Sequence, residues 1–404
     1  MMTRKKWIPN EHRTGYQSFK NYDQNSFNEI SITEHHMKNG ISLLISVLLA
    51  ILILSAGCTD SEPATTSSPG KPTTTGTNAG GVNVDTNYMD SILASTYVQL
   101  DDLKITFIDF NITNPTGSQK TVIVESEVPG FTEKAVNTVD VPAHGNVTIG
   151  QAPSLRTSAI PMEMTTATLH VKVTLADGTR INEQTVPIKI YAKDTMVWAV
   201  SDGEDVTMMT PFIGAWVTPH AVGIDPLVRK AAGYHPDKSI GGYQCQGSCT
   251  DAAWQEYTNE QVKAIFTALK NDYQITYINS PTTFSKATDA SQRVRLPADS
   301  LTSKSANCID GAVLYASALE SIGMTPHLVL VPGHAFVCYE TKPNAPDSLN
   351  CLETTMTGDS TFQEAVQRGN EEFLTEINNG NFKSGASQDL SVADLRKMGI
   401  KPMQ

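Results

Sequence analysis

The strongest constraint on the fold is a change of pattern near residue 194. From about Asp85 to Lys193, apolar and polar residues alternate in short runs such as LKITFIDFNIT, KTVIVESEV and ATLHVKVTL, separated by turn signals. Alternation with a period of two is typical of strands that bury one face. From Asp194 onwards, apolar residues recur mainly at helical spacing. We therefore expect an α+β protein with two domains, residues 85–193 and 194–404.

The first domain is expected to be a small immunoglobulin-like β-sandwich. About seven short strands within roughly 100 residues are typical of that architecture. Asn111 and Asn146 each begin an Asn-x-Thr sequon, which predicts possible glycosylation of an outward-facing domain. The segment contains no catalytic constellation, so its expected role is that of a spacer or a binding module.

Composition narrows the class of partner. The net charge is −12, and 40% of the residues are hydrophobic against 18% charged. These proportions favour globular domains over disorder. A nucleic-acid-binding protein is expected to present a basic face, and the globular part holds no large Lys/Arg cluster. We therefore expect no nucleic-acid partner.

An apolar run near the N-terminus predicts where the chain resides. Residues 41–56, ISLLISVLLAILILSA, carry no charge and are followed closely by Cys58. The run is short for a spanning helix but suits a signal peptide. LSAGC resembles the lipobox of prokaryotic lipoproteins, which implies a lipid on Cys58. Residues 37–58 are thus a signal peptide or, alternatively, an uncleaved anchor. Both alternatives predict an extracytoplasmic protein anchored to the cell membrane.

Two polar segments flank that run. Residues 1–36 lack apolar periodicity, whereas Met37 and Lys38 would begin a conventional signal sequence. We interpret 1–36 as a mis-assigned start or a cytoplasmic tail. Residues 59–84 are rich in Thr, Ser, Pro and Gly, which predicts a linker between membrane and domain.

The second domain is predicted to contain two amphipathic helices. The first has a buried stripe of Val262, Ile265, Phe266 and Leu269. The second begins at Cys308, ends at Gly323, and carries its apolar stripe on Ile309, Ala312, Val313, Ala316, Leu319 and Ile322. Cys308 is therefore expected at the first turn, where free backbone N–H groups and the helix dipole favour a thiolate. The same N–H groups can form half of an oxyanion hole.

Three strands are predicted after this helix. HLVLV and HAFVCYE are joined through Pro332-Gly333, and LNCLETT follows a polar loop. An antiparallel meander would bring His334 near Glu353. A carboxylate beside an imidazole fixes its tautomer, and the imidazole can then take the proton of a thiol. Cys308, His334 and Glu353 are accordingly the candidate nucleophile, base and orienting acid.

The segment NCIDGAVLYASALESIGMTP, followed by GHAFV and LETT, resembles the transglutaminase-like superfamily, which has a papain-like cysteine-peptidase core. The resemblance covers roughly residues 194–404. It implies Cys308 as nucleophile and His334 as base, with Glu353 where the family usually has Asp. Ala306 stands where the family has Gly. The second oxyanion donor has no identifiable counterpart, with Gln244, Gln292 and Trp216 as candidates.

The resemblance implies a cysteine enzyme that acts on an amide through a thioester, without metal or cofactor. The reaction would be proteolysis, amidase action or transglutaminase-type cross-linking of a protein or envelope polymer. Hydrolysis is expected, since no amine site is visible. The alternative is a catalytically silent binding or scaffolding module on the cell surface, with Cys308 a buried hydrophobe and His334 a core histidine. His220, His235 and His327 are interpreted as structural or surface residues.

The remaining cysteines suggest two disulfides outside the membrane, Cys245–Cys249 and Cys338–Cys351. Half of a metal site is the alternative for the first pair. The second pair raises a conflict. If His334 faced Glu353 directly, Cys351 would lie on the diagonal from Cys338, about 7–8 Å away. A disulfide prefers Cα atoms within about 6.8 Å. Either the disulfide forms and Glu353 reaches His334 diagonally, or both thiols stay free.

Overall fold

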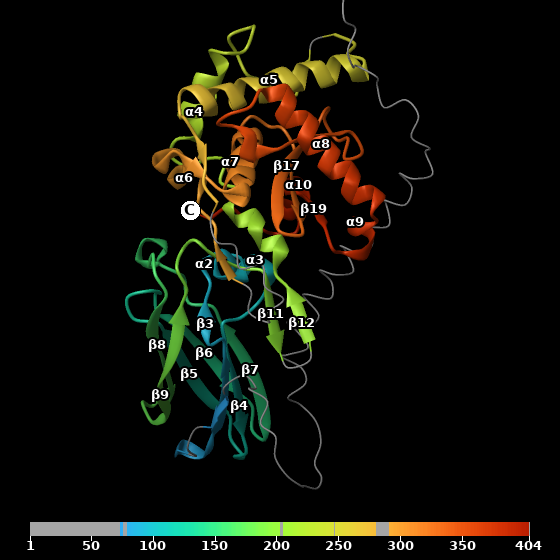
Figure 1. Cartoon of the computed structure of the whole chain (residues 1–404). Coiled ribbons are helices and arrows are strands. Elements are labelled where there is room, and N and C mark those ends of the chain that lie inside the picture. The colour runs from blue at the N-terminus through green and yellow to red at the C-terminus, as the bar shows by residue number, and fades with distance from the viewer. Residues whose placement is uncertain (1–72, 76–78, 203–204, 246, 280–290, 404) are drawn as a thin grey trace, which may run out of the picture.

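The structure, a computed structural model, describes residues 73–75, 79–202, 205–245, 247–279 and 291–403. Figure 1 shows a mixed α/β chain with a long β-sandwich at one end and a helix-rich body at the other. The predicted segments 1–36 and 37–58, Cys58 included, lie outside the described residues. No helix within the described ranges is long and apolar enough to cross a membrane.

Two sheets build the sandwich, in the orders β1-β2-β4-β7 and β3-β9-β8-β5-β6. All neighbouring strands are antiparallel except β3, which runs parallel to β9. The strands are β1 (Thr73–Thr75), β2 (Asn83–Tyr88), β3 (Ser91–Ile92), β4 (Ile108–Asn114), β5 (Lys120–Glu127), β6 (Ala135–Val141), β7 (Gly145–Gln151), β8 (Thr165–Leu175) and β9 (Arg180–Ile190). Short helical turns η1 (Ala79–Gly81), α2 (Ala94–Tyr97), α3 (Leu100–Leu103) and η2 (Thr157–Ala159) connect them.

Alternating burial explains why these segments form a sandwich. In β8, Leu169, Val171 and Val173 are buried and the intervening residues are exposed. They pack with the inward residues of the other strands into one apolar cluster. The sheet begins earlier than the sequence suggested, because β1 and the start of β2 fall within the expected linker 59–84.

The two sequons differ in their surroundings. Asn146 is exposed on β7. Asn111 is half-buried on β4, and its Oδ1 accepts a hydrogen bond of 2.8 Å from the hydroxyl of Thr148. Of the two predicted glycosylation positions, Asn146 is therefore the more accessible.

The second body is built around a four-stranded antiparallel sheet in the order β18-β17-β16-β19. Its strands are β16 (Pro326–Val331), β17 (His334–Glu340), β18 (Leu349–Leu352) and β19 (Gln388–Ser391). Three two-stranded sheets surround it, from β10 (Thr195–Val197), β11 (Ala199–Asp202), β12 (Asp205–Met208), β13 (Thr276–Tyr277), β14 (Ser291–Arg293) and β15 (Ser305–Ala306). The helices are η3 (Thr210–Trp216), α4 (Ile224–Ala232), α5 (Asp251–Asn271), α6 (Pro297–Ser303), α7 (Cys308–Ser321), η4 (Thr354–Met356), α8 (Phe362–Asn378), α9 (Asn381–Ser384) and α10 (Val392–Lys397).

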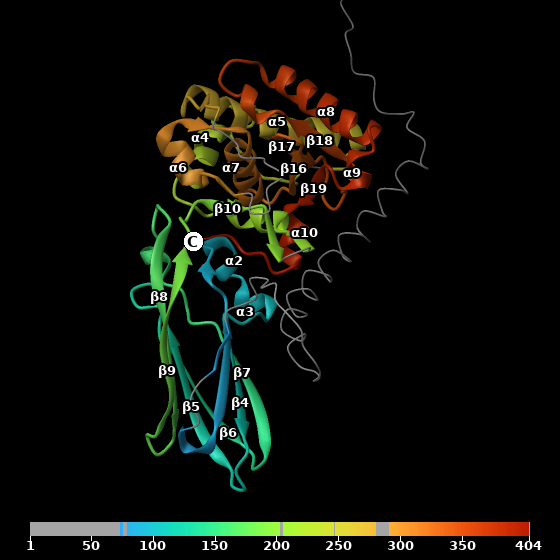
Figure 2. The same cartoon turned by 60° about the horizontal axis from the view of Figure 1, so that its bottom comes forward.

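Helix α7 is the centre of this body. It packs against β16 and β17, while α8 packs mainly against β18, and Figure 2 shows the sheet between the two helices. We expected one buried face on α7, but every residue from Cys308 to Leu319 is buried. The buried polar residues have partners, since the hydroxyl of Ser317 accepts a hydrogen bond from the backbone N–H of Thr218. A helix enclosed on all sides holds its first residue in a fixed position.

The predicted turn residues have the expected conformations. Gly323 follows α7 with φ of 75°, and Gly333 joins β16 to β17 with φ of 80°. Both values lie in the left-handed region that glycine adopts without strain. Because that turn leads directly into β17, it places His334 at the first position of the strand.

The two bodies contact each other through α2, α3 and the last described residues. The side-chain amide of Gln99 donates to the backbone oxygen of Lys401 at 2.8 Å and accepts from its N–H at 2.9 Å. Lys401 also pairs with Asp102 at 2.6 Å. Gln99 is fully buried, so this reciprocal pair stabilises the junction in a low-dielectric setting.

Candidate active site

The candidate site begins at the N-terminus of α7. Cys308 is the first helical residue, and Asn307 is the N-cap. The Asn307 side chain accepts a hydrogen bond from the N–H of Asp310 at 2.9 Å, and Asp310 accepts one from the N–H of Asn307 at 3.2 Å. This capping box fixes the chain entering the helix. Cys308 is therefore held at the first turn, as the sequence predicted.

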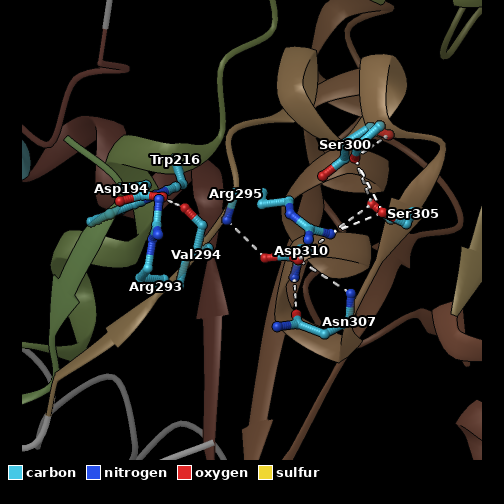
Figure 3. A network of polar contacts seen from close by, with 10 residues as sticks. Asp194, Trp216, Arg293, Val294, Arg295, Ser300, Ser305, Asn307 and Asp310 are labelled. Carbon is cyan, nitrogen blue, oxygen red and sulfur yellow. Dashed lines mark hydrogen bonds and ion pairs between the residues drawn. The ribbon is translucent and has the colours of Figure 1, made fainter. Parts of the chain in front are cut away.

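Asp310 also ties this turn to a neighbouring strand. Figure 3 shows its carboxylate between Asn307 and Arg295, and its Oδ1 accepts from the backbone N–H of Arg295 at 2.8 Å. Burial raises the pKa of Asp310, and the N–H groups that it accepts act in the opposite direction. The Arg295 guanidinium donates to the hydroxyl of Ser305 at 3.1 Å. The turn that holds Cys308 is thus supported by residues that precede it in the sequence.

His334 and Glu353 form the second part of the site. His334 Nε2 lies 2.7 Å from Glu353 Oε2. The other carboxylate oxygen, Oε1, accepts from the N–H and the hydroxyl of Thr355 at 2.9 and 2.6 Å. Both oxygens are engaged, so the carboxylate is held in one orientation. Burial alone would raise the pKa of Glu353, but the hydrogen bonds from His334 and Thr355 together lower it.

The strand register shows how Glu353 reaches His334. Cys338 pairs directly with Cys351, and the two form a disulfide with Cα atoms 3.9 Å apart. Glu353 therefore lies diagonally across from His334 rather than opposite to it. Of the two alternatives left open by the sequence, the structure contains the disulfide together with the diagonal pair. The one-methylene-longer Glu side chain suits this diagonal reach.

The thiol and the imidazole interact across the end of the sheet. Burial acts to lower the pKa of His334, but Cys308 and Glu353 outweigh it and raise the pKa to about 10. No thiol–imidazole hydrogen bond of regular geometry is present among the described residues. Catalytic hydrogen bonds are often loose before substrate binds. The arrangement favours an imidazolium between two acidic groups.

A close contact couples the nucleophile's helix to the acid's loop. Gly311, one turn after Cys308, faces Thr354, the residue after Glu353. A Cβ at position 311 would lie 2.7 Å from the Thr354 hydroxyl oxygen. That hydroxyl also donates to the backbone oxygen of Cys308 at 3.4 Å. Glycine at 311 thus permits the helix and the loop to touch, which sets the spacing of thiol and carboxylate.

A third acidic group approaches the pair from α8. Ligand atoms of Glu372, His334 and Glu353 all lie within 4.8 Å of one another. These three groups are of types that bind a divalent cation. Glu372 also pairs with Arg368 at 3.2 Å. Burial is the main cause that raises the pKa of Glu372.

The structure separates other candidates from the site. Cys245 and Cys249 form a disulfide in the loop before α5. Among the proposed oxyanion donors, Trp216 donates its indole N–H to the oxygen of Val294 at 2.8 Å, so that donor is already engaged. Gln244 is exposed and Gln292 is buried. His220 is exposed, whereas His235 and His327 are buried away from the thiol.

Three features near the site were not predicted from the sequence: the capping box, Glu372 and Tyr277. The pattern Asn-x-x-Asp around Cys308 was a visible signal for the capping box. Glu372 had no such signal, because it lies on α8, nineteen positions after Glu353. Tyr277 lies on β13, which pairs with β15 just before Cys308. Both come from elements whose placement depends on the whole fold.

Comparisons with known proteins do not identify a family for this chain. No family model matches the chain, and no curated protein matches it. Among solved structures, it has a similarity to the crystal structure of a "putative protease" from Parabacteroides distasonis ATCC 8503. The identity is 12%, the match covers 70% of this chain and 68% of that one, and the TM-score is 0.21. A TM-score this low establishes neither a shared fold nor a shared activity.

Proposed function

We propose that residues 194–404 are a transglutaminase-like, papain-like cysteine enzyme that hydrolyses an amide through a thioester. Cys308 is the nucleophile, His334 the general base and acid, and Glu353 the orienting carboxylate. The observation that carries the proposal is the 2.7 Å His334–Glu353 hydrogen bond on an imidazole whose pKa is also raised by the Cys308 thiol. The preceding β-sandwich, proposed to be immunoglobulin-like, acts as a spacer or binding module.

The chemistry follows from these positions. His334 takes the proton of Cys308, and Sγ adds to the amide carbonyl carbon. The C–N bond then breaks while the imidazolium gives its proton to the leaving nitrogen, and a thioester remains. Water, deprotonated by His334, attacks the thioester; the C–S bond breaks, a carboxylic acid leaves, and the thiol is restored. The N–H groups at the start of α7 supply one side of an oxyanion hole.

The predicted N-terminal lipid or anchor completes the proposal. It would hold the enzyme on the outer side of the cell membrane, where protein or envelope polymer is the available amide substrate. Two disulfides in the structure are compatible with an oxidising compartment.

The rate of Cys308 alkylation by iodoacetamide, measured against pH on the full chain with mass spectrometry of the labelled site, tests the proposal. We expect a thiol that reacts well below pH 8, and a profile that returns to that of an ordinary cysteine in His334→Ala. The matched control is His327→Ala, which removes another histidine, a buried one, from the same sheet. Identical profiles for the wild type and His334→Ala would refute the thiol–imidazole pair.

One observation favours a second candidate, a catalytically silent surface module. Cys308 is only 4% exposed, and the imidazole beside it has a side chain that is 25% exposed. A closed site of this kind suits a binding module that has kept the fold. Slow alkylation, unchanged by His334→Ala, would support this candidate.

A further inference from the structure

Strand β13 (Thr276–Tyr277) lies close to Cys308, and one of its edges is open among the described residues. It pairs in parallel with β15, which ends two residues before Cys308, and these two strands form a sheet of their own. The N–H groups of Thr276 and Ile278 donate to Lys304 and Ala306 at 3.0 Å each. In a parallel ladder, alternate residues bond to the same neighbour. The N–H and C=O of Tyr277 therefore point to the other edge, where no described residue bonds them.

The residues on this edge are exposed and partly apolar. Tyr277 is 42% exposed and Ile278 is 46% exposed. Folded proteins usually cover or charge an open strand edge, because it is a template for another strand. Among the described residues, this edge of β13 is neither covered by another segment nor protected by a charged side chain of the strand.

The two faces of the β13–β15 sheet differ. Tyr277 pairs directly with Ala306 and lies close enough to Cys308 and Glu353 for their charges to raise its pKa, although burial is the main cause. Ile278, on the opposite face, lines a cavity of about 360 Å³ together with Asn279 and Asn307. Arg295, whose side chain is 39% exposed, also lines this cavity.

We propose that the open edge of β13 binds an extended polypeptide substrate as a third strand, and that Tyr277 and the Ile278 cavity contact its side chains alternately. This inference rests on the proposed function, because it names the substrate of the same site. The reason is the period of a strand, in which successive side chains point to opposite faces. One side chain of the bound peptide faces Tyr277 and the thiol, and its neighbours along the chain face the cavity. Strand addition to an open edge is an established mode of peptide recognition.

The charged lining gives the cavity a chemical preference. Arg295 Nη1 donates to Ser305 and lies 3.8 Å from a carboxylate oxygen of Asp310, which also lines the cavity. Asp194 and Arg293, which pair with each other at 2.8 Å, complete the charged lining. Because the acidic and basic groups balance, the inference is that the cavity accepts an uncharged polar side chain, such as a carboxamide.

The test uses the full chain and a pool of randomised hexapeptides with an N-terminal iodoacetyl group and a C-terminal fluorophore. A matched pool carries N-methyl groups on its backbone, and free iodoacetamide is the third reagent. We expect the first pool to label Cys308 about tenfold faster than iodoacetamide, since two backbone hydrogen bonds support about that factor. N-methylation is expected to remove the gain, because it blocks the N–H groups that a strand must offer.

Two variants locate the effect. Tyr277→Pro removes the free N–H without breaking a ladder bond, and Tyr277→Ala removes only the side chain. Both are expected to slow the peptide pool more than they slow free iodoacetamide, and the ratio of the two rates should fall by the larger factor in the proline variant. Tyr234→Ala, which removes an equally exposed tyrosine (43%) after α4, is the control and is expected to change neither rate. Melting temperatures identify any variant that fails to fold, in which case Tyr277→Ala carries the test.

The outcomes separate this inference from the proposed function. An activated thiol that reacts no faster with the peptide pool, or equally fast with the N-methylated pool, overturns the inference and leaves the function intact. A thiol with ordinary reactivity defeats the function. In that case, peptide binding to the edge of β13 is measured separately, by the fluorescence anisotropy of the same peptides without the iodoacetyl group. Binding that Tyr277→Pro weakens about threefold, the share of one of the two hydrogen bonds, upholds the inference, and no binding overturns it.

Discussion

Two histidines of the same sheet show what distinguishes a candidate catalytic group from a structural one. His327 on β16 lies 2.8 Å from Asp389 through Nδ1 and 3.7 Å from Glu340 through Nε2. His334 on β17 lies 2.7 Å from Glu353. Burial acts to lower the pKa of both, but Asp389 and Glu340 raise that of His327 to about 10, and Cys308 and Glu353 raise that of His334 to about 10. The difference is access: the His327 side chain is 3% exposed and has no thiol beside it, whereas the His334 side chain is 25% exposed and faces Cys308.

A perturbed pKa is therefore not sufficient evidence that a residue takes part in catalysis. Buried ion pairs that serve only the fold shift pKa values as strongly as active sites do. A titratable group becomes a candidate for chemistry when it also faces a nucleophile and an opening. Substitutions of the two histidines should therefore have different effects.

The largest expected effect is on the reaction at His334. His334→Ala removes the base, so we expect amide hydrolysis to fall by about 10³-fold, in the range found for the loss of a general base. Unfolding free energy should fall as well, because Glu353 loses its partner, but by less than in the His327 variant, since the His334 side chain is 25% exposed. Rates on a peptide substrate and a urea titration measure the two quantities. An unchanged rate would remove His334 from the mechanism.

Substitution of His327 should lower the stability and leave the reactivity of the thiol unchanged. His327→Gln leaves two carboxylates facing each other without a cation, and the loss of one partner from a buried pair costs about 3 kcal/mol. Cys308 alkylation should stay within about twofold of the wild type, since no contact joins His327 to the thiol. If His327→Gln instead lost thiol reactivity and kept its stability, His327 would not be the structural residue of the two.

The third effect is on the orientation of the base. Glu353→Gln keeps the size of the side chain but removes the charge that stabilises the imidazolium. We expect a loss of about 10²-fold in turnover, smaller than for His334→Ala. Thr355→Val is the matched second change, because it removes one of the two donors to the same carboxylate. Its effect should be smaller still, and an equal effect would show that orientation matters more than charge.

Stability should depend on pH through His327. The pKa of His327 in the folded protein is raised from its ordinary value of about 6.5 to about 10. The stabilisation is therefore complete below about pH 6.5 and is lost as the pH rises toward 10. We expect the slope to approach about 1 kcal/mol per pH unit within this window. Denaturant titrations between pH 6 and 10 should show a flatter curve for His327→Gln, and parallel curves would contradict the ion pair.

The smallest effect is expected at Glu372, which borders the candidate pair on the side of α8. Its charge adds to the field that favours the imidazolium, so Glu372→Gln should slow Cys308 alkylation by a few-fold at most. Arg368→Gln, which removes the partner of Glu372 on the same helix, is the matched control and should act in the opposite direction. A loss as large as that of Glu353→Gln would give Glu372 a direct role in the reaction.

Features set by neighbouring residues could be predicted from the sequence. The alternation of 85–193 predicted strands, and Gly323 and Gly333 predicted a helix end and a turn, because these depend on a few consecutive residues. The mixed α/β class followed from the same patterns. The proximity of His334 and Glu353 also followed, because only one tight turn and one loop lie between their strands.

Features set by distant partners could not be predicted. Asp310 and Ser317 are polar and lie outside the predicted apolar stripe of α7, but both are buried, because their partners Arg295 and Thr218 lie on other segments. The diagonal approach of Glu353 depends on the register of β18, which is fixed by packing across the whole sheet. The start of the sheet at β1 was hidden because Thr-rich sequence is compatible with both a linker and an edge strand.

The separation of the sulfur atoms has a consequence for redox chemistry. Cys308 packs in the apolar cluster around α7, whereas Cys338 and Cys351 pack with Phe373 and Phe382 in a separate cluster. Exchange between a thiolate and a disulfide requires in-line attack on a disulfide sulfur. Because the sheet lies between the two clusters, Cys308 has no such approach. A reactive thiolate and a structural disulfide can therefore coexist in one small domain without scrambling.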